Sequence, residues 1–277
     1  MTSPRSQCAR SHPRPLAFAG LLFALCVLTS IETAAQSSTS APSPASSPVA
    51  VQACGQRLQI GDSSVACLTL IHGSSDAGPI DVSIDGSVLF TGVAFGSSTG
   101  FVALQAGTYG IRVTATSQPD TVLFESPGQK FVAGEGIELA IVGSRDATTL
   151  AGLILPIQTS TPSAGSASLR VVQAIPDAPP IDLALSSGET IIAGLAPLSA
   201  SDYLAVPATA SSIEILAAGS TDVLFPVPGF TAPDGATITV YSLGSVTNPT
   251  GIVLVTVLVP GPGSDAAEPL MVATPAA

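Results

Sequence analysis

One short stretch of the chain, Ile71–Gly86, gathers the side chains that could do chemistry. A histidine there, His72, could act as a general base, because imidazole takes up and releases protons near neutral pH. Three carboxylates follow it, Asp76, Asp81 and Asp85, and carboxylate oxygens are the ligands that Ca²⁺ prefers. The stretch therefore raises two functional hypotheses, a catalytic base and a calcium site.

The same spacing also fits a purely structural role. Asp76 precedes a turn, where its carboxylate can accept backbone N–H groups. Asp85 is followed by Gly86 between apolar residues, a pattern typical of a two-residue hairpin turn with positive φ at both positions. Asp81 and Asp85 lie about 13 Å apart if both are on one strand, which is too far to share an ion. We therefore expect structural roles for His72, Asp76, Asp81 and Asp85, with neither metal nor cofactor, and keep calcium as the alternative.

A serine motif also calls for comparison with hydrolases. Residues 96–100 read Gly-Ser-Ser-Thr-Gly and match the pattern around a nucleophilic serine, which needs a helix directly after it. Phe101–Leu104 has the composition of a strand instead, and His72 precedes the serine, which reverses the hydrolase order. Lys130 is the only lysine, and no glycine-rich phosphate loop opens a helix. We expect no enzymatic activity, and an enzyme that uses His72 is the remaining alternative.

The N-terminal residues are typical of a secretory signal. Three arginines precede an apolar run, Leu16–Leu28, which is 13 residues long and short for a membrane span. Small residues follow, so we expect cleavage after Ala35. An uncleaved anchor is the alternative, and Leu25 argues against a lipoprotein signal at Cys26. The pattern predicts a secreted or cell-surface protein without a stable membrane span after cleavage.

Charge and cysteine content support this location and narrow the partners. Residues 36–277 keep five of eight basic residues and eighteen of nineteen acidic ones, a net charge of about −13. Such a surface repels nucleic acid and anionic lipid. Two cysteines, Cys54 and Cys67, remain and predict one disulfide in an oxidising compartment, with about 3 kcal/mol of stabilisation. A metal-binding pair is the disfavoured alternative, because one histidine cannot complete a tetrahedral site.

An offset of 101 residues aligns the chain with itself and reveals an internal repeat. The aligned segments are Leu68 with Leu169, Asp76-Ala77 with Asp177-Ala178, Pro79-Ile80-Asp81 with Pro180-Ile181-Asp182, Val122-Leu123-Phe124 with Val223-Leu224-Phe225, and Gly143-Ser144 with Gly244-Ser245. The chain therefore holds two copies of one domain, and Asp177 and Asp182 should have the structural roles of Asp76 and Asp81.

Hydropathy alternates with a period of two in both copies, and Gly, Pro, Asp and Ser interrupt it every eight to twelve residues. The pattern predicts an all-β chain with two tandem immunoglobulin-like β-sandwich domains of about seven strands each; a small barrel is the alternative. Ile252–Val259 is apolar on both faces and is predicted to be a central strand. We expect a signal peptide at 1–35, a disordered Ser/Pro/Ala stalk at 36–50, the first repeat at 51–156, a linker at 157–167, the second repeat at 168–260 and a disordered tail at 261–277.

The first copy resembles the bacterial family called domain of unknown function 4397. Members of that family characteristically have four features: a His-Ala-Ser-Pro-Asp-Ala-Pro segment, a Val-Asp-Val strand with an Asp-Gly turn, a Gly-Val-x-Phe-Gly segment and an Ala-Gly-x-Tyr turn. The matching residues here are His72, Asp76, Pro79, Asp81, Asp85-Gly86, Gly92-Val93, Phe95-Gly96 and Ala106-Gly107-Thr108-Tyr109. The second copy keeps Asp177 and Asp182 but has Gln173 in place of the histidine. The resemblance implies secreted or surface-attached tandem β-domains without an established activity.

These observations predict a non-enzymatic exported or cell-surface protein that presents two β-sandwich modules for adhesion, envelope structure or ligand binding. Its partner would be an extracellular protein or a glycan, and the chain would be a monomer. A carbohydrate-binding or accessory module of an extracellular hydrolase system is the alternative. The absence of Trp and the presence of only three Tyr count against it, because sugar-binding surfaces usually present aromatic rings.

Overall fold

The computed structural model describes residue 54 and residues 65–261, except 186, 211 and 229. The signal peptide, the stalk and nearly all of the tail predicted above lie outside these residues. Within the described part, no helix has the length and apolarity to cross a membrane. The strands are β1 (Val65–His72), β2 (Ile80–Ile84), β3 (Ser87–Val93), β4 (Val102–Gln105), β5 (Gly107–Ala115), β6 (Gln118–Phe131), β7 (Gly136–Val142), β8 (Ala151–Pro156), β9 (Ser166–Gln173), β10 (Ile181–Leu185), β11 (Thr190–Leu195), β12 (Ser199–Ala200), β13 (Leu204–Pro207), β14 (Ser212–Ala217), β15 (Val223–Pro228), β16 (Thr237–Ser245) and β17 (Asn248–Val259).

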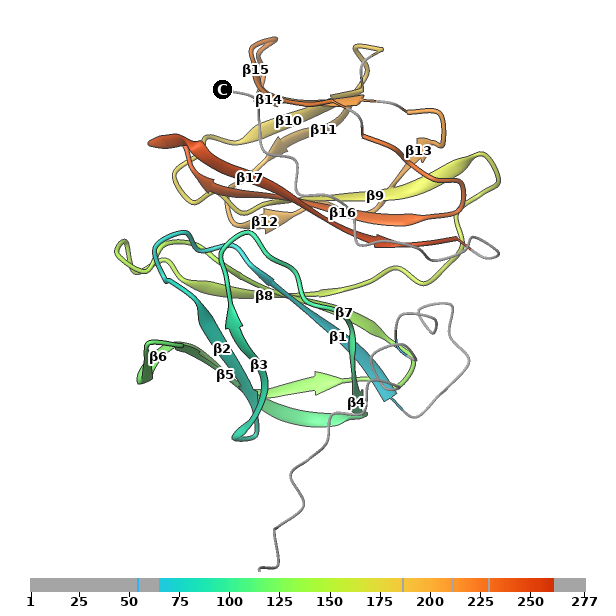
Figure 1. Cartoon of the computed structure of the whole chain (residues 1–277). Coiled ribbons are helices and arrows are strands. Elements are labelled where there is room, and N and C mark those ends of the chain that lie inside the picture. Colours follow the sequence, from blue (N-terminus) through green and yellow to red (C-terminus); the bar gives the residue numbers. More distant parts are fainter. Residues whose placement is uncertain (1–53, 55–64, 186, 211, 229, 262–277) are drawn as a thin grey trace, which may run out of the picture. The chain divides into compact units, whose positions relative to one another are not determined.

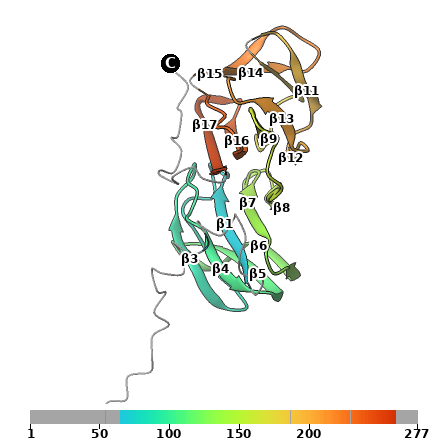
Figure 2. The same ribbon diagram turned by 90° about the vertical axis from the view of Figure 1, so that its right-hand side faces the viewer.

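The first repeat is a sandwich of two four-stranded sheets, in the orders β4-β1-β7-β8 and β3-β2-β5-β6 (Figure 1). Strands β1 and β7 run parallel to each other, whereas every other paired neighbour is antiparallel. Figure 2, turned by 90°, shows β1 beside β7. The parallel pair places the first and seventh strands at the centre of one sheet.

The second repeat has the same strand order. Its sheets run β12-β9-β16-β17 and β11-β10-β14-β15, with β13 also paired to β9 and with β9 parallel to β16. The prediction of two tandem β-sandwich domains is confirmed. The immunoglobulin constant type divides its seven strands four and three between two sheets, whereas the first repeat here divides eight strands equally.

Alternating apolar residues of the two sheets form a separate core inside each sandwich. In β2, Ile80, Val82 and Ile84 are buried and alternate with partly exposed residues, as their period-two pattern predicts. The core of the second repeat uses the equivalent residues of β10, with Leu183 among them. In the first repeat the Tyr109 hydroxyl also donates to the Gln105 carbonyl at 2.9 Å, a tyrosine-corner contact of the kind found in sandwiches.

The prediction for Ile252–Val259 as a central strand is wrong. These residues belong to β17, which among the described strands pairs with β16 alone and lies at the edge of its sheet. Its apolar character on both faces has another cause. Leu254 packs into the core of the second repeat, whereas Val255 and Val257 pack into a cluster that includes Ile71 of the first repeat. The outer face is therefore covered by the neighbouring domain and not by a further layer of its own.

The turn predicted at Asp85-Gly86 is confirmed. Ile84 pairs with Ser87 across a two-residue loop, and the φ angles of Asp85 and Gly86 are 46° and 80°. Positive φ at both central positions matches the right-handed twist of the flanking strands. The Asp85 carboxylate also accepts the Gly110 N–H at 2.7 Å, which ties this turn to β5.

Candidate functional site

The histidine of the opening stretch is fully buried at the end of β1. His72 Nε2 lies 2.7 Å from the Gly78 carbonyl oxygen, so Nε2 carries the proton and donates. Nδ1 then accepts the Ser74 N–H at 3.4 Å. Burial lowers the pKa of His72, against the opposing effect of the bond with Gly78. Both ring nitrogens of the neutral imidazole therefore hold the loop that follows β1.

In the second repeat the amide side chain of Gln173 takes the structural role that His72 has in the first. Gln173 lies at the position of His72, and its Oε1 accepts the N–H of Ile175, two residues on, at 3.5 Å. The same oxygen accepts the Ser242 hydroxyl at 2.6 Å. In the first repeat the histidine likewise accepts the N–H two residues on. Both side chains thus satisfy a backbone donor at one loop, a role that requires no proton transfer.

Asp76 joins two loops that are distant in sequence. Its carboxylate accepts the Ser144 hydroxyl at 2.6 Å and the N–H groups of Arg145 and Asp146 at 2.9 and 3.0 Å. The Ser74 hydroxyl donates a fourth bond at 2.8 Å. Although partial burial acts to raise it, these bonds lower the pKa of Asp76 well below its usual value. Ser144, Arg145 and Asp146 lie between β7 and β8, so the carboxylate anchors a distant loop as well as its own turn.

The second repeat reproduces this arrangement at the same offset. Asp177 accepts the Ser245 hydroxyl at 2.6 Å and the N–H groups of Val246 and Thr247 at 3.0 and 3.2 Å. Partial burial acts to raise the pKa of Asp177, but these bonds lower it. We call Asp76 and Asp177, with their loop partners, the two aspartate clasps.

Each aspartate clasp depends on a glycine directly before its serine. Gly143 has φ +94°, and a Cβ there would lie 2.3 Å from the Thr149 carbonyl oxygen. Gly244 has φ +120°, and a Cβ there would lie 2.7 Å from the Gly251 carbonyl oxygen. No L side chain fits such a site without backbone movement. The Gly-Ser pair that identified the repeat is therefore the start of the clasp loop.

The next aspartate in each repeat holds a hairpin and a bulge. Asp81 accepts the Gly92 N–H at 2.7 Å and the Thr116 hydroxyl at 2.6 Å. Asp182 accepts the N–H groups of Gly194 and Gly219 at 2.6 and 2.8 Å, and these bonds lower its pKa. Among the described residues, no three His, Cys, Asp or Glu side chains lie close enough to hold a metal ion together.

The serine motif at residues 96–100 lines β1 and precedes a strand. Leu70 accepts the Thr99 N–H at its carbonyl and donates its own N–H to the Thr99 hydroxyl, at 2.9 and 3.0 Å. Ser98 forms an isolated bridge with Ile71. In the second repeat the Ser201 hydroxyl accepts the Val171 N–H at 3.0 Å. In each repeat a loop hydroxyl therefore accepts a backbone N–H of the first strand. In the first repeat β4 follows, where a nucleophile elbow needs a helix.

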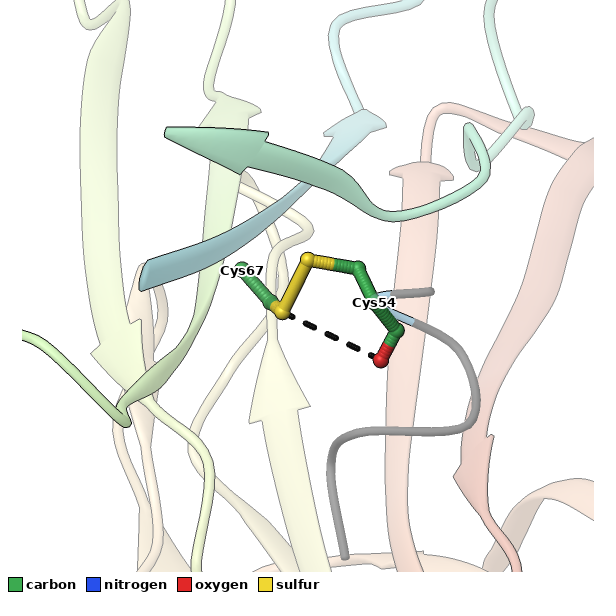
Figure 3. Close-up of a disulfide and its surroundings, with 2 residues drawn as sticks. All are labelled: Cys54 and Cys67. Carbon is green, nitrogen blue, oxygen red and sulfur yellow. Dashed lines mark hydrogen bonds between the residues drawn. A yellow bond between two sulfur atoms is a disulfide. The ribbon is translucent and has the colours of Figure 1, made fainter. Parts of the chain in front are cut away.

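The predicted disulfide between Cys54 and Cys67 is confirmed, with Cα atoms 5.7 Å apart (Figure 3). It joins the segment before the first sandwich to β1. Both cysteines are buried in a small apolar cluster with Ile157, which follows β8, and Val259, the last residue of β17. The bridge therefore lies where both repeats and the segment between them meet.

The two repeats meet through the outer faces of the β1 and β9 sheets. An apolar cluster there draws on both domains. Its buried members are Ile71, Ala140 and Val142 from the first repeat and Val172, Ala174, Tyr241, Leu243, Val255 and Val257 from the second. The contact is close, because a Cβ at Gly73 would lie 2.8 Å from the Leu243 side chain. We call this contact the junction.

A buried ion pair crosses the junction. Arg170 of β9 donates from Nη2 to Glu138 Oε2 of β7 at 2.9 Å, and both side chains are at most 5% exposed. Arg170 Nη1 donates to the Pro156 carbonyl at 2.8 Å. The fully buried Tyr241 donates its hydroxyl to the same Glu138 oxygen. Glu138 therefore accepts hydrogen bonds from Arg170 and Tyr241, which both belong to the opposite repeat.

The surroundings of the ion pair define its electrostatics. Arg170 stacks its guanidinium 4.4 Å from the ring centroid of Tyr203, whose hydroxyl lies 3.2 Å from the Thr239 hydroxyl. Burial raises the pKa of Glu138, while the Arg170 charge and the Tyr241 hydroxyl oppose that change. Burial and the Glu138 charge raise the pKa of Tyr241. The carboxylate faces donors only, so its ionised form is the one that this geometry satisfies.

Sequence reasoning did not identify this network. Two signals for it were present. Arg170 interrupts an otherwise apolar segment of β9, and Glu138 interrupts one in β7. A charge inside a strand buried on both faces indicates a partner on a second buried surface. The charged groups of this network face each other away from solvent.

Comparison with known proteins agrees with the repeat structure. Residues 66–184 and 167–268 match the family described as "Domain of unknown function (DUF4397)". Each match begins at the second residue of the first strand of a repeat, in β1 and in β9. A search of curated proteins finds none that matches. The two matches together cover well over half of the chain, and the chain therefore belongs to the DUF4397 family.

Proposed function

We propose that this is a non-enzymatic exported or cell-surface protein in which two β-sandwich modules act as one rigid body. The body would serve adhesion, envelope structure or ligand binding, with an extracellular protein or a glycan as its partner. The observation that carries the proposal is the buried Glu138–Arg170 pair. An ion pair buried between two modules needs fixed geometry to offset the cost of its desolvation. Modules that move freely relative to each other would not hold the pair in that geometry.

The other polar residues support the non-enzymatic part of the proposal. His72, Asp76 and Asp177 are each engaged by backbone groups of their own repeat. A general base must instead reach a proton on a substrate. Gln173 takes the position of His72 in the second repeat and makes the matching backbone contact, which favours a shared scaffold role.

Export is supported by two independent features. The first 35 residues have the charge and apolar pattern of a secretory signal. A disulfide closes between Cys54 and Cys67, and such bonds persist in oxidising compartments. The excess of acidic residues keeps an exported body soluble and favours partners that are neutral or basic.

The test is to express the full chain in a bacterium with a general secretion pathway and to fractionate the culture. Exported material should have lost about 35 residues and carry the disulfide. The same material is then screened against glycans, cell-wall fractions and model ester, glycoside and peptide substrates, with His72→Gln as the matched control. Binding without turnover, equal in both proteins, is expected. Turnover that His72→Gln abolishes, or retention in the cytoplasm, would contradict the proposal.

A further inference from the structure

The two repeats use the same face of the same fold at the junction. Ile71 and Val172 occupy equivalent positions, one offset of 101 residues apart, and both lie in the junction cluster. The same holds for Val142 and Leu243. An interface that uses the same face on both partners is closed. Once two repeats have paired, neither has that face free for another repeat. A third repeat therefore cannot add to the pair through this surface.

The polar residues break the equivalence. The position of Arg170 is held by Thr69 in the first repeat, and the position of Glu138 is held by Thr239 in the second. The position of Tyr241 is held by Ala140. The first repeat therefore contributes the carboxylate of Glu138 and the small Ala140. The second repeat contributes the guanidinium of Arg170 and the large side chain of Tyr241. Only the mixed pair brings Arg170 and Tyr241 onto Glu138, as the structure shows.

We propose that the junction face is a recognition surface with two types. A first-type repeat, which carries Glu138, pairs with a second-type repeat, which carries Arg170 and Tyr241, and two repeats of the same type do not pair. Two first-type faces would bury Glu138 with no arginine opposite it. Two second-type faces would bury Arg170 with no acid and would bring two Tyr241 rings to a surface that now receives one. An unpaired buried charge and an overfilled core are both strongly unfavourable. The specificity therefore resides in three side chains of the junction.

The pairing should also persist after the connection between the repeats is cut. The junction holds its own apolar cluster and ion pair. In the connecting segment Ile157 and Gln158 contact the second repeat, whereas residues 160 and 161 are exposed and can be cut without removing these contacts. The covalent link raises the effective concentration of one repeat for the other, so it favours pairing within one chain. The inference does not rest on export or on the absence of catalysis, and its test is separate from theirs.

The experiment uses the full chain with a protease recognition sequence inserted between Thr161 and Pro162. After cleavage, the mass in solution is measured by light scattering over a dilution series. The two halves are expected to remain together as one 1:1 particle. In Arg170→Glu, which places an acid opposite Glu138, the halves should separate at concentrations at least tenfold higher than in the wild type. Lys130→Glu, at an exposed lysine of β6 outside the junction and outside both aspartate clasps, changes the net charge equally and should leave the halves paired.

A milder variant covers the case in which Arg170→Glu prevents folding. Arg170→Gln removes the charge and keeps a donor, and it should also weaken pairing by tenfold or more. Separation of the cut wild-type halves while both remain folded would overturn the inference. So would cut Arg170→Gln halves that stay as tightly paired as the wild type. Self-association of either released half as strong as the mixed pair would likewise overturn it.

Discussion

Arg170 of the second repeat and Glu138 of the first form an ion pair at 2.9 Å that is closed off from solvent. Arg170 Nε is buried beside it and has no hydrogen-bond partner among the described residues. A buried ion pair of this kind adds little net stability, since desolvation offsets most of the attraction. Its value lies in its geometry, because removing either member leaves the other charge buried and unpaired.

The free energy of unfolding should therefore respond differently when one member of the ion pair is replaced and when both are replaced. Arg170→Met is expected to lower the free energy of unfolding by about 3–5 kcal/mol, since Glu138 loses its counter-charge. Combining it with Glu138→Gln should recover a large part of that loss, because no unpaired charge remains. Denaturant titration of the full chain measures both, with Arg112→Met, at an exposed arginine of β5, as the control for loss of an arginine. Additive losses in the double variant would show that the two side chains do not interact.

Tyr241→Phe is expected to lower the free energy of unfolding by about 1–3 kcal/mol. The change removes one hydroxyl and leaves the Glu138 carboxylate with one donor fewer in a buried site. Tyr109→Phe is the matched control, because the Tyr109 hydroxyl bonds a backbone carbonyl at an exposed position, where water can replace it. Equal losses for the two variants would contradict the special role assigned to the junction.

His72→Gln should change the free energy of unfolding by no more than about 1 kcal/mol at pH 7. Burial lowers the pKa of His72 below its ordinary value of 6.5. The folded state thus binds the proton less readily than the unfolded state, so the histidine's contribution is complete above pH 6.5 and is lost as the pH falls below it. Urea titrations between pH 7 and 5 should show the wild type losing stability relative to His72→Gln. Parallel curves for the two proteins would argue against a buried neutral imidazole.

Both aspartate clasps should contribute to stability. Asp76→Ala and Asp177→Ala are each expected to lower the free energy of unfolding by about 1–2 kcal/mol through lost hydrogen bonds to backbone N–H groups, with the exposed part of each carboxylate limiting the loss. The pKa of each carboxyl is lowered in the fold. Their contribution is therefore full above the unfolded value of 3.8 and is lost as the pH falls below it. Acid titration of Asp76→Asn should be flatter than that of the wild type below pH 4, and an unchanged slope would count against the clasp.

Gly143→Ala should be far more damaging than Gly78→Ala. Both glycines have positive φ, 94° and 68°, so both variants carry the same kind of backbone strain. A Cβ at Gly143 would meet the Thr149 carbonyl oxygen at 2.3 Å, whereas nothing lies within 4 Å of one at Gly78. Thermal melts should show a loss of about 1 kcal/mol at Gly78 and a clearly larger one at Gly143. Similar melting temperatures would mean that the clasp loop moves freely.

Local patterns in the sequence were sufficient for much of the fold. The period-two alternation of Ile80, Val82 and Ile84 predicted β2, and Asp85-Gly86 predicted its turn, because each depends on neighbouring residues only. The repeat offset and the two cysteines predicted the domain pair and the disulfide. These features need no knowledge of how distant faces meet.

The junction could not be predicted in the same way, because it depends on which faces of two folded domains come together. Ile252–Val259 shows the difficulty. Its apolar residues on both faces indicated burial on both sides, but not that the second layer belongs to the other repeat. Glu138 and Arg170 lie 32 residues apart in sequence, and neither belongs to a motif. Their meeting follows from the strand order and from the face that each repeat presents.

Calorimetry of the full chain tests the central claim, that the two repeats form one body joined at the junction. The wild type should unfold in one transition whose calorimetric and van't Hoff enthalpies agree, since the repeats stabilise each other. Arg170→Glu should separate this into two transitions, one for each sandwich. Two independent transitions in the wild type, unchanged by Arg170→Glu, would contradict the account.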